Sequence, residues 1–225
     1  MYHPEYGKAL QILPGIHRLY QKTINTNNKD VRLAVYYLAG GCITEAGFAL
    51  QAWTNGDLNT PFRVKRYIDE AKLLIICMIA VKDRERFVRK FFQDEIVTID
   101  PKKYQNEVMV ATGMDVVTFK KWIEVNKTLH HGFSKGVHPT YRSVAYNTNV
   151  DTGEFDYEAK SLAFHSIDGF DFANFVVIPA IDSVIIPSEV FGISKDELSE
   201  ICELREKIQQ IAINGFKTRN TERNQ

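Results

Sequence analysis

The sequence predicts a mainly α-helical fold, a single-domain multi-helix bundle with one β-hairpin insertion. Apolar residues recur every three or four positions along most of the 225 residues, which is the spacing of amphipathic helices. The spacing changes to alternation only within residues 144–159, on either side of a glycine-containing turn. No internal repeat and no linker rich in Pro, Gly or Ser divides the sequence. We therefore expect one helical domain over residues 1–215 and a flexible polar tail over residues 216–225.

The first half of the chain carries recognisable helix boundaries. Residues 8–24 have helical apolar spacing, but Pro14 and Gly15 interrupt it and predict a kink or a late start. Asp30 is placed to cap a long helix that stops at Asn55 and Gly56. Further helices are expected over residues 62–81, 84–92 and 104–111, the last ended by Gly113, and from Val116 onward after a cap at Asp115.

The second half returns to a helical pattern after the hairpin. This pattern resumes at Asp171, passes Pro179 and stops at Pro187. Ser194 and Glu197 have the spacing of a capping box, so a last helix is expected to begin there and to end at Gly215.

Composition excludes several classes of protein. Lys plus Arg and Asp plus Glu are each 28, so the chain lacks the strong positive charge typical of proteins that bind nucleic acids or anionic membranes. Cys42, Cys77 and Cys202 are far apart and form no CxxC pair, which argues against a zinc or redox site. Isolated cysteines suit a reducing compartment, and the N-terminus lacks the pattern of a signal peptide. We therefore expect a cytoplasmic protein.

Residues 33–52 approach the ~20 residues that a membrane-spanning helix needs, with Glu45 as their only charge. Polar residues within this segment and the absence of an anchoring pattern at its flanks favour a central helix buried on most sides. We expect no membrane span. A buried carboxylate is costly unless it is paired, so Glu45 is expected to be buried and to contact a basic or donor group. The neighbouring predicted helix offers Arg63, Lys65, Arg66 and Lys72 for a structural ion pair, and a contribution of Glu45 to a binding pocket is the alternative.

Residues 129–142, LHHGFSKGVHPTYR, hold three of the six histidines. Imidazole titrates near neutral pH and can act as an acid, a base or an anion ligand. The candidate catalytic residues are His131, His138, Lys135 and Arg142, and the candidate binding residues are Lys127, Ser134, Tyr141 and Glu45. The alternative is that His130 and His138 are hydrogen-bonded packing residues and that the rest is a solvated turn.

Metal and nucleotide chemistry find no support in the sequence. On a helix His130 and His131 diverge, and no carboxylate stands at a familiar ligand spacing from His131 or His138. The chain has no GxSxG elbow, no GxxxxGK[ST] loop and no GxGxxG loop. We therefore expect no metal and no other cofactor.

A helical chain with a late Ser-x-x-x-His-Pro element, here Ser134 to His138 and Pro139, resembles the HEPN-like helical proteins and bacterial families placed near them. The resemblance implies a cytoplasmic bacterial protein of a defence or stress setting, in a superfamily that includes RNases. The arginine that its nucleases carry four to six residues before a histidine is absent before His130, His131 and His138. We therefore expect a protein that acts by binding RNA or a partner protein, or as a homo-oligomer. The alternative is a metal-independent RNase that uses His138 or His131 with Lys135 and Arg142.

Overall fold

The computed structural model describes residues 3–57, 59–95, 97, 99–124 and 172–223, and every regular element within them is helical. The prediction of a mainly α-helical fold is therefore confirmed. The predicted hairpin at residues 144–159 lies outside the described residues and stays a prediction.

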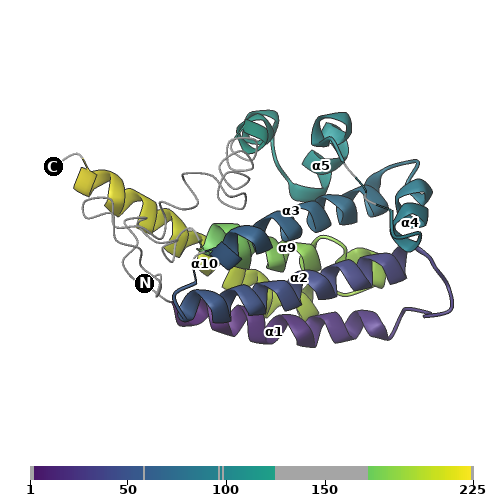
Figure 1. Cartoon of the computed structure of the whole chain (residues 1–225), viewed down its shortest axis with the longest axis horizontal. Helices are drawn as coiled ribbons and strands as arrows, with labels where there is room; N and C mark the ends of the chain where they lie inside the picture. Colours follow the sequence, from purple (N-terminus) through teal and green to yellow (C-terminus); the bar gives the residue numbers. More distant parts are fainter. Residues whose placement is uncertain (1–2, 58, 96, 98, 125–171, 224–225) are drawn as a thin grey trace, which may run out of the picture.

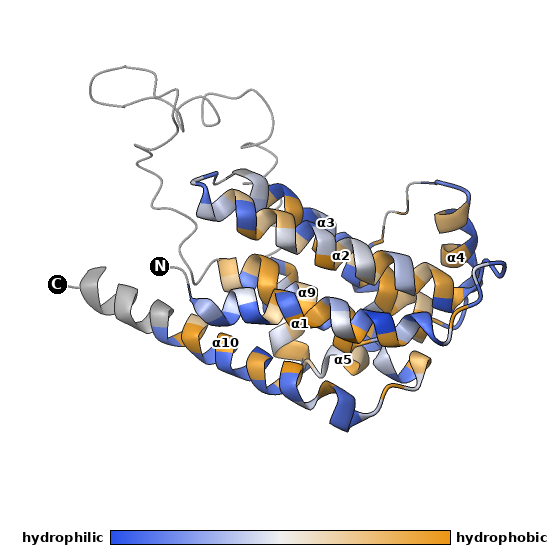
Figure 2. Ribbon diagram, turned by 90° about the horizontal axis from the view of Figure 1, so that it is seen from below, coloured by the Kyte–Doolittle hydropathy of each residue, from blue (hydrophilic) through white to orange (hydrophobic). Residues whose placement is uncertain are grey.

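Five helices of the described part pack together as a bundle (Figure 1). The first three, α1 (Pro4–Gln21), α2 (Val31–Thr54) and α3 (Asn59–Ala80), run antiparallel to one another in chain order. The last two, α9 (Ile178–Ile185) and α10 (Lys195–Arg223), lie behind them. In Figure 2 α9 lies between α2 and α3 on one side and α10 on the other. The short helix α9 is therefore the centre of the core.

Aromatic stacks close the bundle core at its two ends. The rings of Tyr20 and Phe191 stack with centroids 3.9 Å apart, and Trp53 stacks on Phe172 at 4.4 Å. The Tyr20 hydroxyl also donates a hydrogen bond to the carbonyl of Val184 in α9. These contacts join α1 and α2 to α9 and its flanking turns, and the buried Tyr20 hydroxyl has the hydrogen-bond partner that a closely packed interior requires.

A smaller group of elements covers one end and one side of α3. It consists of α4 (Glu85–Phe92), a 3₁₀ turn η1 (Pro101–Tyr104), α5 (Gln105–Thr112) and the helical residues 116–124. Ile76, Val108 and Phe119 form a second apolar cluster between α3 and these elements. The Arg86 guanidinium donates to the Tyr104 hydroxyl and joins α4 to η1.

Most helix ends lie where local chemistry places them. Asp30 accepts a hydrogen bond from the backbone N–H of Leu33 at 3.0 Å and caps α2. Gly113 ends α5 in the left-handed region at φ 68°. Ser194 and Glu197 form the reciprocal bonds of a capping box before α10. These sequence predictions are confirmed.

The late start predicted for the first helix and the end predicted at Gly215 are wrong, while the alternative of a kink at Pro14 stays a prediction. Helix α1 begins at Pro4 and continues through Pro14 and Gly15, and α10 continues past Gly215 to Arg223. A proline at position 14 removes one backbone donor, and the packed face of α1 retains its contacts. A glycine ends a helix when it turns left-handed, and within a helix it costs only about 1 kcal/mol relative to alanine.

The chain enters α9 through a π-helical turn, η2 (Ala173–Val177), and leaves it at a 3₁₀ turn, η3 (Ser188–Phe191). Pro179 lacks a backbone N–H, and its ring crowds the carbonyl of the preceding turn. A π-helical turn widens the backbone at that point and accommodates the proline. The predicted helical segment that passes Pro179 and stops at Pro187 is therefore confirmed.

Two helical segments, Val31–Thr54 and Ala173–Phe191, are long and apolar enough to cross a membrane. About half of the apolar window in each is buried within the bundle, as in the core helices of a soluble protein, so the finding is weak evidence for a span. The sequence alone had singled out residues 33–52 of the first segment.

Candidate functional site

Most of the predicted site residues lie outside the described residues. They are His131, His138, Lys135, Arg142, Ser134, Tyr141 and Lys127. Glu45 is the candidate that the structure places, on α2. The histidine site therefore stays a prediction, and a site is sought among the described helices.

Glu45 is partly exposed rather than buried. Three of the basic residues expected to pair with Glu45 pair with other carboxylates instead. Lys65 pairs with Asp69, Arg66 with Glu70 and Lys72 with Asp182. The fourth, Arg63, is exposed. The prediction of a buried Glu45 paired with one of these residues is therefore wrong. The cause is that Glu45 lies on a side of α2 that points away from the bundle, four residues after Gly41 and three before Phe48, so the apolar composition of this helix does not imply burial there.

A pair of glycines lets side chains from both neighbouring helices lie on α2. A Cβ added at Gly40 would come 2.9 Å from Cε1 of His17 in α1. A Cβ added at Gly41 would overlap the hydroxyl of Tyr67 in α3. His17 and Tyr67 thus flank α2 at the same level, and the two glycines are needed for this close approach.

The His17 side of this arrangement is rigid. The imidazole stacks on Tyr36 with ring centroids 4.2 Å apart and planes 10° from parallel. Its Nε2 lies 2.8 Å from the Tyr36 carbonyl oxygen, to which an Nε2–H donates. Burial lowers the pKa of His17, and the bond to the carbonyl opposes this only in part. The neutral imidazole is therefore a packing group between α1 and α2.

The Tyr67 side is open to solvent. Tyr37, Phe48 and Tyr67 expose 49%, 61% and 41% of their surfaces. Tyr37 and Phe48 are eleven residues apart, three helical turns, so they share one side of α2 with Thr44 between them. Burial raises the pKa of Tyr67, with smaller contributions from Cys42 and Glu45, so its hydroxyl is a neutral donor. We call the set of Tyr37, Gly41, Thr44, Phe48 and Tyr67 the outer face.

The outer face has an unusual composition for a solvent-facing helix surface. Glu45 is the only charged residue of α2 after Arg32. Large apolar side chains that cluster on a surface with few charges mark interaction sites, whereas single exposed apolar residues are normal. The arrangement offers aromatic contact area and the Tyr37 and Tyr67 hydroxyls for hydrogen bonding.

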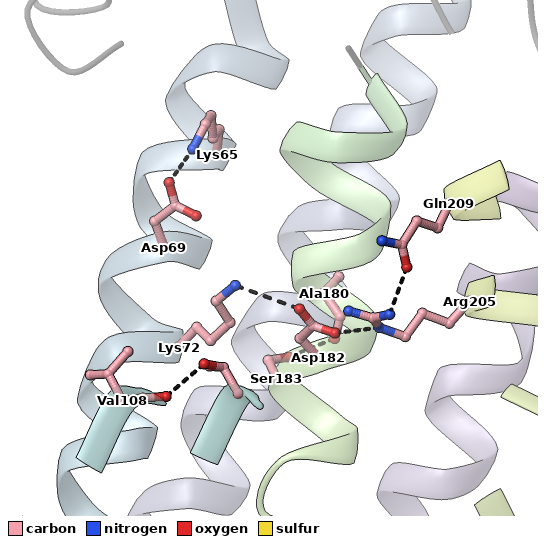
Figure 3. Close-up of polar contacts among 10 residues, drawn as sticks. Lys65, Asp69, Lys72, Val108, Ala180, Asp182, Ser183, Arg205 and Gln209 are labelled. Carbon is pink, nitrogen blue, oxygen red and sulfur yellow. Dashed lines mark hydrogen bonds and ion pairs between the residues drawn. The ribbon is translucent and has the colours of Figure 1, made fainter. Parts of the chain in front are cut away.

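The core contains a second polar arrangement, centred on Asp182 of α9 (Figure 3). Arg205 of α10 donates from Nε to Asp182 Oδ1 at 2.7 Å, and Lys72 Nζ of α3 lies 3.6 Å from Oδ2. Arg205 also donates to Gln209 at 3.1 Å. The pKa of Arg205 is raised because the Asp182 carboxylate outweighs the effect of burial. We call Lys72, Asp182 and Arg205 the ion triad, and it joins three helices.

In the ion triad and its neighbours, two carboxylates pair with three cations inside the protein. Lys65 pairs with Asp69 one turn from Lys72, and its ammonium lies 5.5 Å from the centroid of the Phe175 ring. Both oxygens of Asp182 are engaged by cations of neighbouring helices, and its side chain is 17% exposed. The geometry fits a structural role that fixes α9 between α3 and α10.

The described cysteines are poor nucleophiles. Burial raises the pKa of Cys42 and of Cys77 to about 12, and it also raises the pKa of Cys202. A thiol with a raised pKa is almost entirely protonated at neutral pH, and the thiolate is the reactive form. Among the described residues, no group of three His, Cys, Asp or Glu side chains is placed to hold a metal ion.

Two open pockets at the ends of the bundle are lined largely by side chains already in use. One of about 350 Å³ lies between the start of α1 and α10, where Lys207 pairs with Glu5 at 2.7 Å and Lys8 with Glu200 at 3.0 Å. The Lys207 ammonium, as the largest influence, lowers the pKa of Glu5. The other, of about 660 Å³, lies at the start of α2 and includes Asp30, the helix cap. Neither pocket brings together several unpaired charged or polar side chains that could bind one ligand.

Searches for similar proteins return nothing for this chain. No protein-family model, no curated protein and no solved structure matches it. The candidate site therefore rests on the geometry of the outer face.

Sequence reasoning did not identify the outer face. The signals that point to it are the adjacent Tyr36-Tyr37 and Gly40-Gly41 pairs, which lie in residues 33–52, where the apolar composition predicts burial on most sides. Periodicity fails on α2 because nearly all of its positions are uncharged, so the buried and exposed sides look alike.

Proposed function

We propose that this chain acts by binding another protein molecule through the outer face, in the cytoplasm. The observation that carries the proposal is the exposure of Tyr37, Phe48 and Tyr67 on one side of a helix that has a single charge after Arg32. Aromatic side chains contribute a large share of the binding energy at protein interfaces, where lysine and acidic residues are depleted.

The rest of the described bundle supports this role as a scaffold. The ion triad fixes α9, and the stacks of His17 on Tyr36 and of Trp53 on Phe172 fix α2 from both sides. A face held by rigid helices loses little conformational entropy when it binds. The resemblance to HEPN-like proteins suggests a bacterial defence or stress setting for the binding event.

A metal-independent RNase remains the second candidate, because of the histidines, lysine and arginine at residues 131–142. It requires His131, His138, Lys135 and Arg142 to converge on a solvent-open surface. It is compatible with the outer face, since a binding face and a catalytic site can occupy different surfaces of one molecule.

Site-specific photocrosslinking tests the binding proposal. A photoreactive phenylalanine analogue replaces Phe48 in one variant and Val117, which is 63% exposed and lies away from α2, in a control variant. We expect a discrete crosslinked adduct from position 48 that is absent from position 117. Loss of the adduct when Tyr37 is changed to Ser would link it to the outer face.

The outcomes separate the two candidate functions. If position 48 gives no more adduct than position 117, binding through the outer face is wrong. Cleavage of diverse RNAs by the purified chain in a chelator, reduced about 100-fold or more by His138→Ala, would establish the RNase function.

A further inference from the structure

We propose that the outer face binds a second copy of this chain, with α2 packed antiparallel on α2 of that copy about a two-fold axis near Gly41. This inference rests on the proposed function, because it names the partner of the same face. It follows from the self-complementary order of side chains on α2 and α3.

The first complementary pair lies on α2. Tyr37 and Phe48 are three turns apart on one side of the helix, about 17 Å along its axis. In an antiparallel pair of helices related by a two-fold axis, the residue at one end of such a set meets the residue at the other end in the second copy. Tyr37 of each copy therefore meets Phe48 of the other, and the interface contains two aromatic pairs around the central Thr44 and Gly41.

The second complementary pair lies on α3. Arg63 and Glu70 are two turns apart on the side of the helix that carries Tyr67, and both are exposed. The same antiparallel arrangement places Arg63 of each copy opposite Glu70 of the other. Glu70 already accepts from Arg66 at 2.9 Å, so its carboxylate would be held between two guanidinium groups.

One axis satisfies both pairs. The overlap of the Tyr67 hydroxyl with the Cβ position of Gly41 sets α3 beside α2. The midpoint between Tyr37 and Phe48 falls next to Cys42, and the midpoint between Arg63 and Glu70 falls next to Tyr67. These midpoints lie within about one helical turn of each other along the bundle, a difference that long Arg and Glu side chains span.

The area of the face fits a weak dimer. The exposed stretches, residues 37–54 of α2 and 60–70 of α3, are each about 10 Å wide and present about 450 Å² on each copy, because Leu33 and Ile76 beyond them are buried. The total of about 900 Å² lies below the about 1,200–2,000 Å² of stable specific interfaces and within the range of weak, transient ones. Aromatic residues lie on both sides of the axis, Glu45 lies within one turn of it, and Arg63 and Glu70 lie at the rim.

A charge exchange on the purified full-length chain tests the arrangement. Sedimentation equilibrium measures self-association of the chain and of four variants: Phe48→Glu, Arg63→Glu, Glu70→Arg and the double variant Arg63→Glu with Glu70→Arg. We expect a dimer that each single substitution weakens by about tenfold or more. The double variant is expected to recover most of the affinity, because it restores opposite charges across the axis in both places.

Val117→Glu adds the same charge at an exposed apolar position in helical residues 116–124, outside the outer face, and is expected to leave self-association unchanged. Circular dichroism of every variant identifies any that do not fold, and Tyr37→Ser serves in place of a variant that fails. A monomer at the highest soluble concentration, a dimer insensitive to Phe48→Glu, or a double variant no better than the singles would overturn the inference. A monomeric chain whose position 48 crosslinks to a different protein would overturn it and leave the proposed function standing.

Discussion

Arg205 Nε donates a hydrogen bond to Asp182 Oδ1 at 2.7 Å and joins the last helix of the bundle to the central one. Asp182 also faces Lys72 of α3, so one carboxylate connects three helices. Because the side chain of Lys72 is 9% exposed, loss of the carboxylate leaves this cation poorly hydrated and both cations without their shared partner.

Asp182→Ala should therefore destabilise the fold by about 2–3 kcal/mol. Removing one partner of a fully buried ion pair typically costs about 3–5 kcal/mol. The cost here is expected to be smaller, because the Arg205 side chain is 31% exposed. Urea unfolding followed by circular dichroism measures the difference. The control is Arg66→Ala, which removes an exposed pair with Glu70 within one helix and should cost about 0.5 kcal/mol or less. Equal costs for the two variants would contradict the structural role of the ion triad.

His17 gives the fold a pH dependence of known sign. Burial lowers its pKa below the ordinary 6.5, so the unfolded chain binds a proton at a higher pH than the folded chain does. The contribution to stability is complete above pH 6.5 and is lost as the pH falls from there through the lowered pKa. The free energy of unfolding should therefore be smaller at about pH 5.5 than at about pH 7.5.

His17→Gln isolates this effect, because glutamine keeps an N–H donor for the Tyr36 carbonyl and does not titrate. The variant should show a weaker dependence of unfolding free energy on pH in the same window. Glu5 and Glu197, whose pKa values are lowered below 4.5, complete their titration at more acidic pH. An unchanged slope in the variant would show that His17 is not the source.

Gly40 and Gly41 should respond differently to alanine. Alanine favours a helix by about 1 kcal/mol over glycine, so both variants gain this amount locally. At Gly40 the new methyl group meets His17, which its stack and hydrogen bond hold in place, so Gly40→Ala should be destabilising overall. At Gly41 it meets the end of the partly exposed Tyr67 side chain, which can swing outward, so Gly41→Ala should be close to neutral. Thermal unfolding of both variants measures the contrast, and the reverse order would contradict it.

Ser194→Ala should cost about 1 kcal/mol, because it removes the side-chain acceptor for the Glu197 N–H and the hydroxyl that donates to the Glu197 carboxylate. Ser199→Ala is the matched control, since Ser199 bonds only to the carbonyl of Asp196 within α10. Chemical denaturation compares the two. A similar cost at both positions would show that the capping box does not stabilise α10.

Features that depend on a few neighbouring residues were predictable from the sequence. The cap at Asp30, the stop at Gly113 and the box at Ser194 each depend on side chains within four residues of a helix end. The end expected at Gly215 failed for a related reason, since glycine permits a left-handed turn without requiring it.

Features that depend on distant neighbours were not predictable. Lys72, Asp182 and Arg205 come together from three helices, and no local pattern marks Asp182 as the acceptor for both cations. The prediction that Glu45 is buried failed because the sequence of an apolar helix is similar whether its outer side packs in the bundle or faces solvent. The histidine candidates lie outside the described residues and stay predictions.

The π-helical turn at Ala173–Val177 sets the rotation of α9 about its helix axis relative to the residues before the turn. One additional residue rotates everything downstream by about 100° relative to an uninterrupted α-helix. Phe172, before the turn, stacks on Trp53, while Asp182, after it, faces Arg205. A deletion of one residue within the turn would leave the composition of the core almost unchanged, and yet the two contacts could no longer form at the same time. The segment should therefore tolerate substitution far better than a change in length.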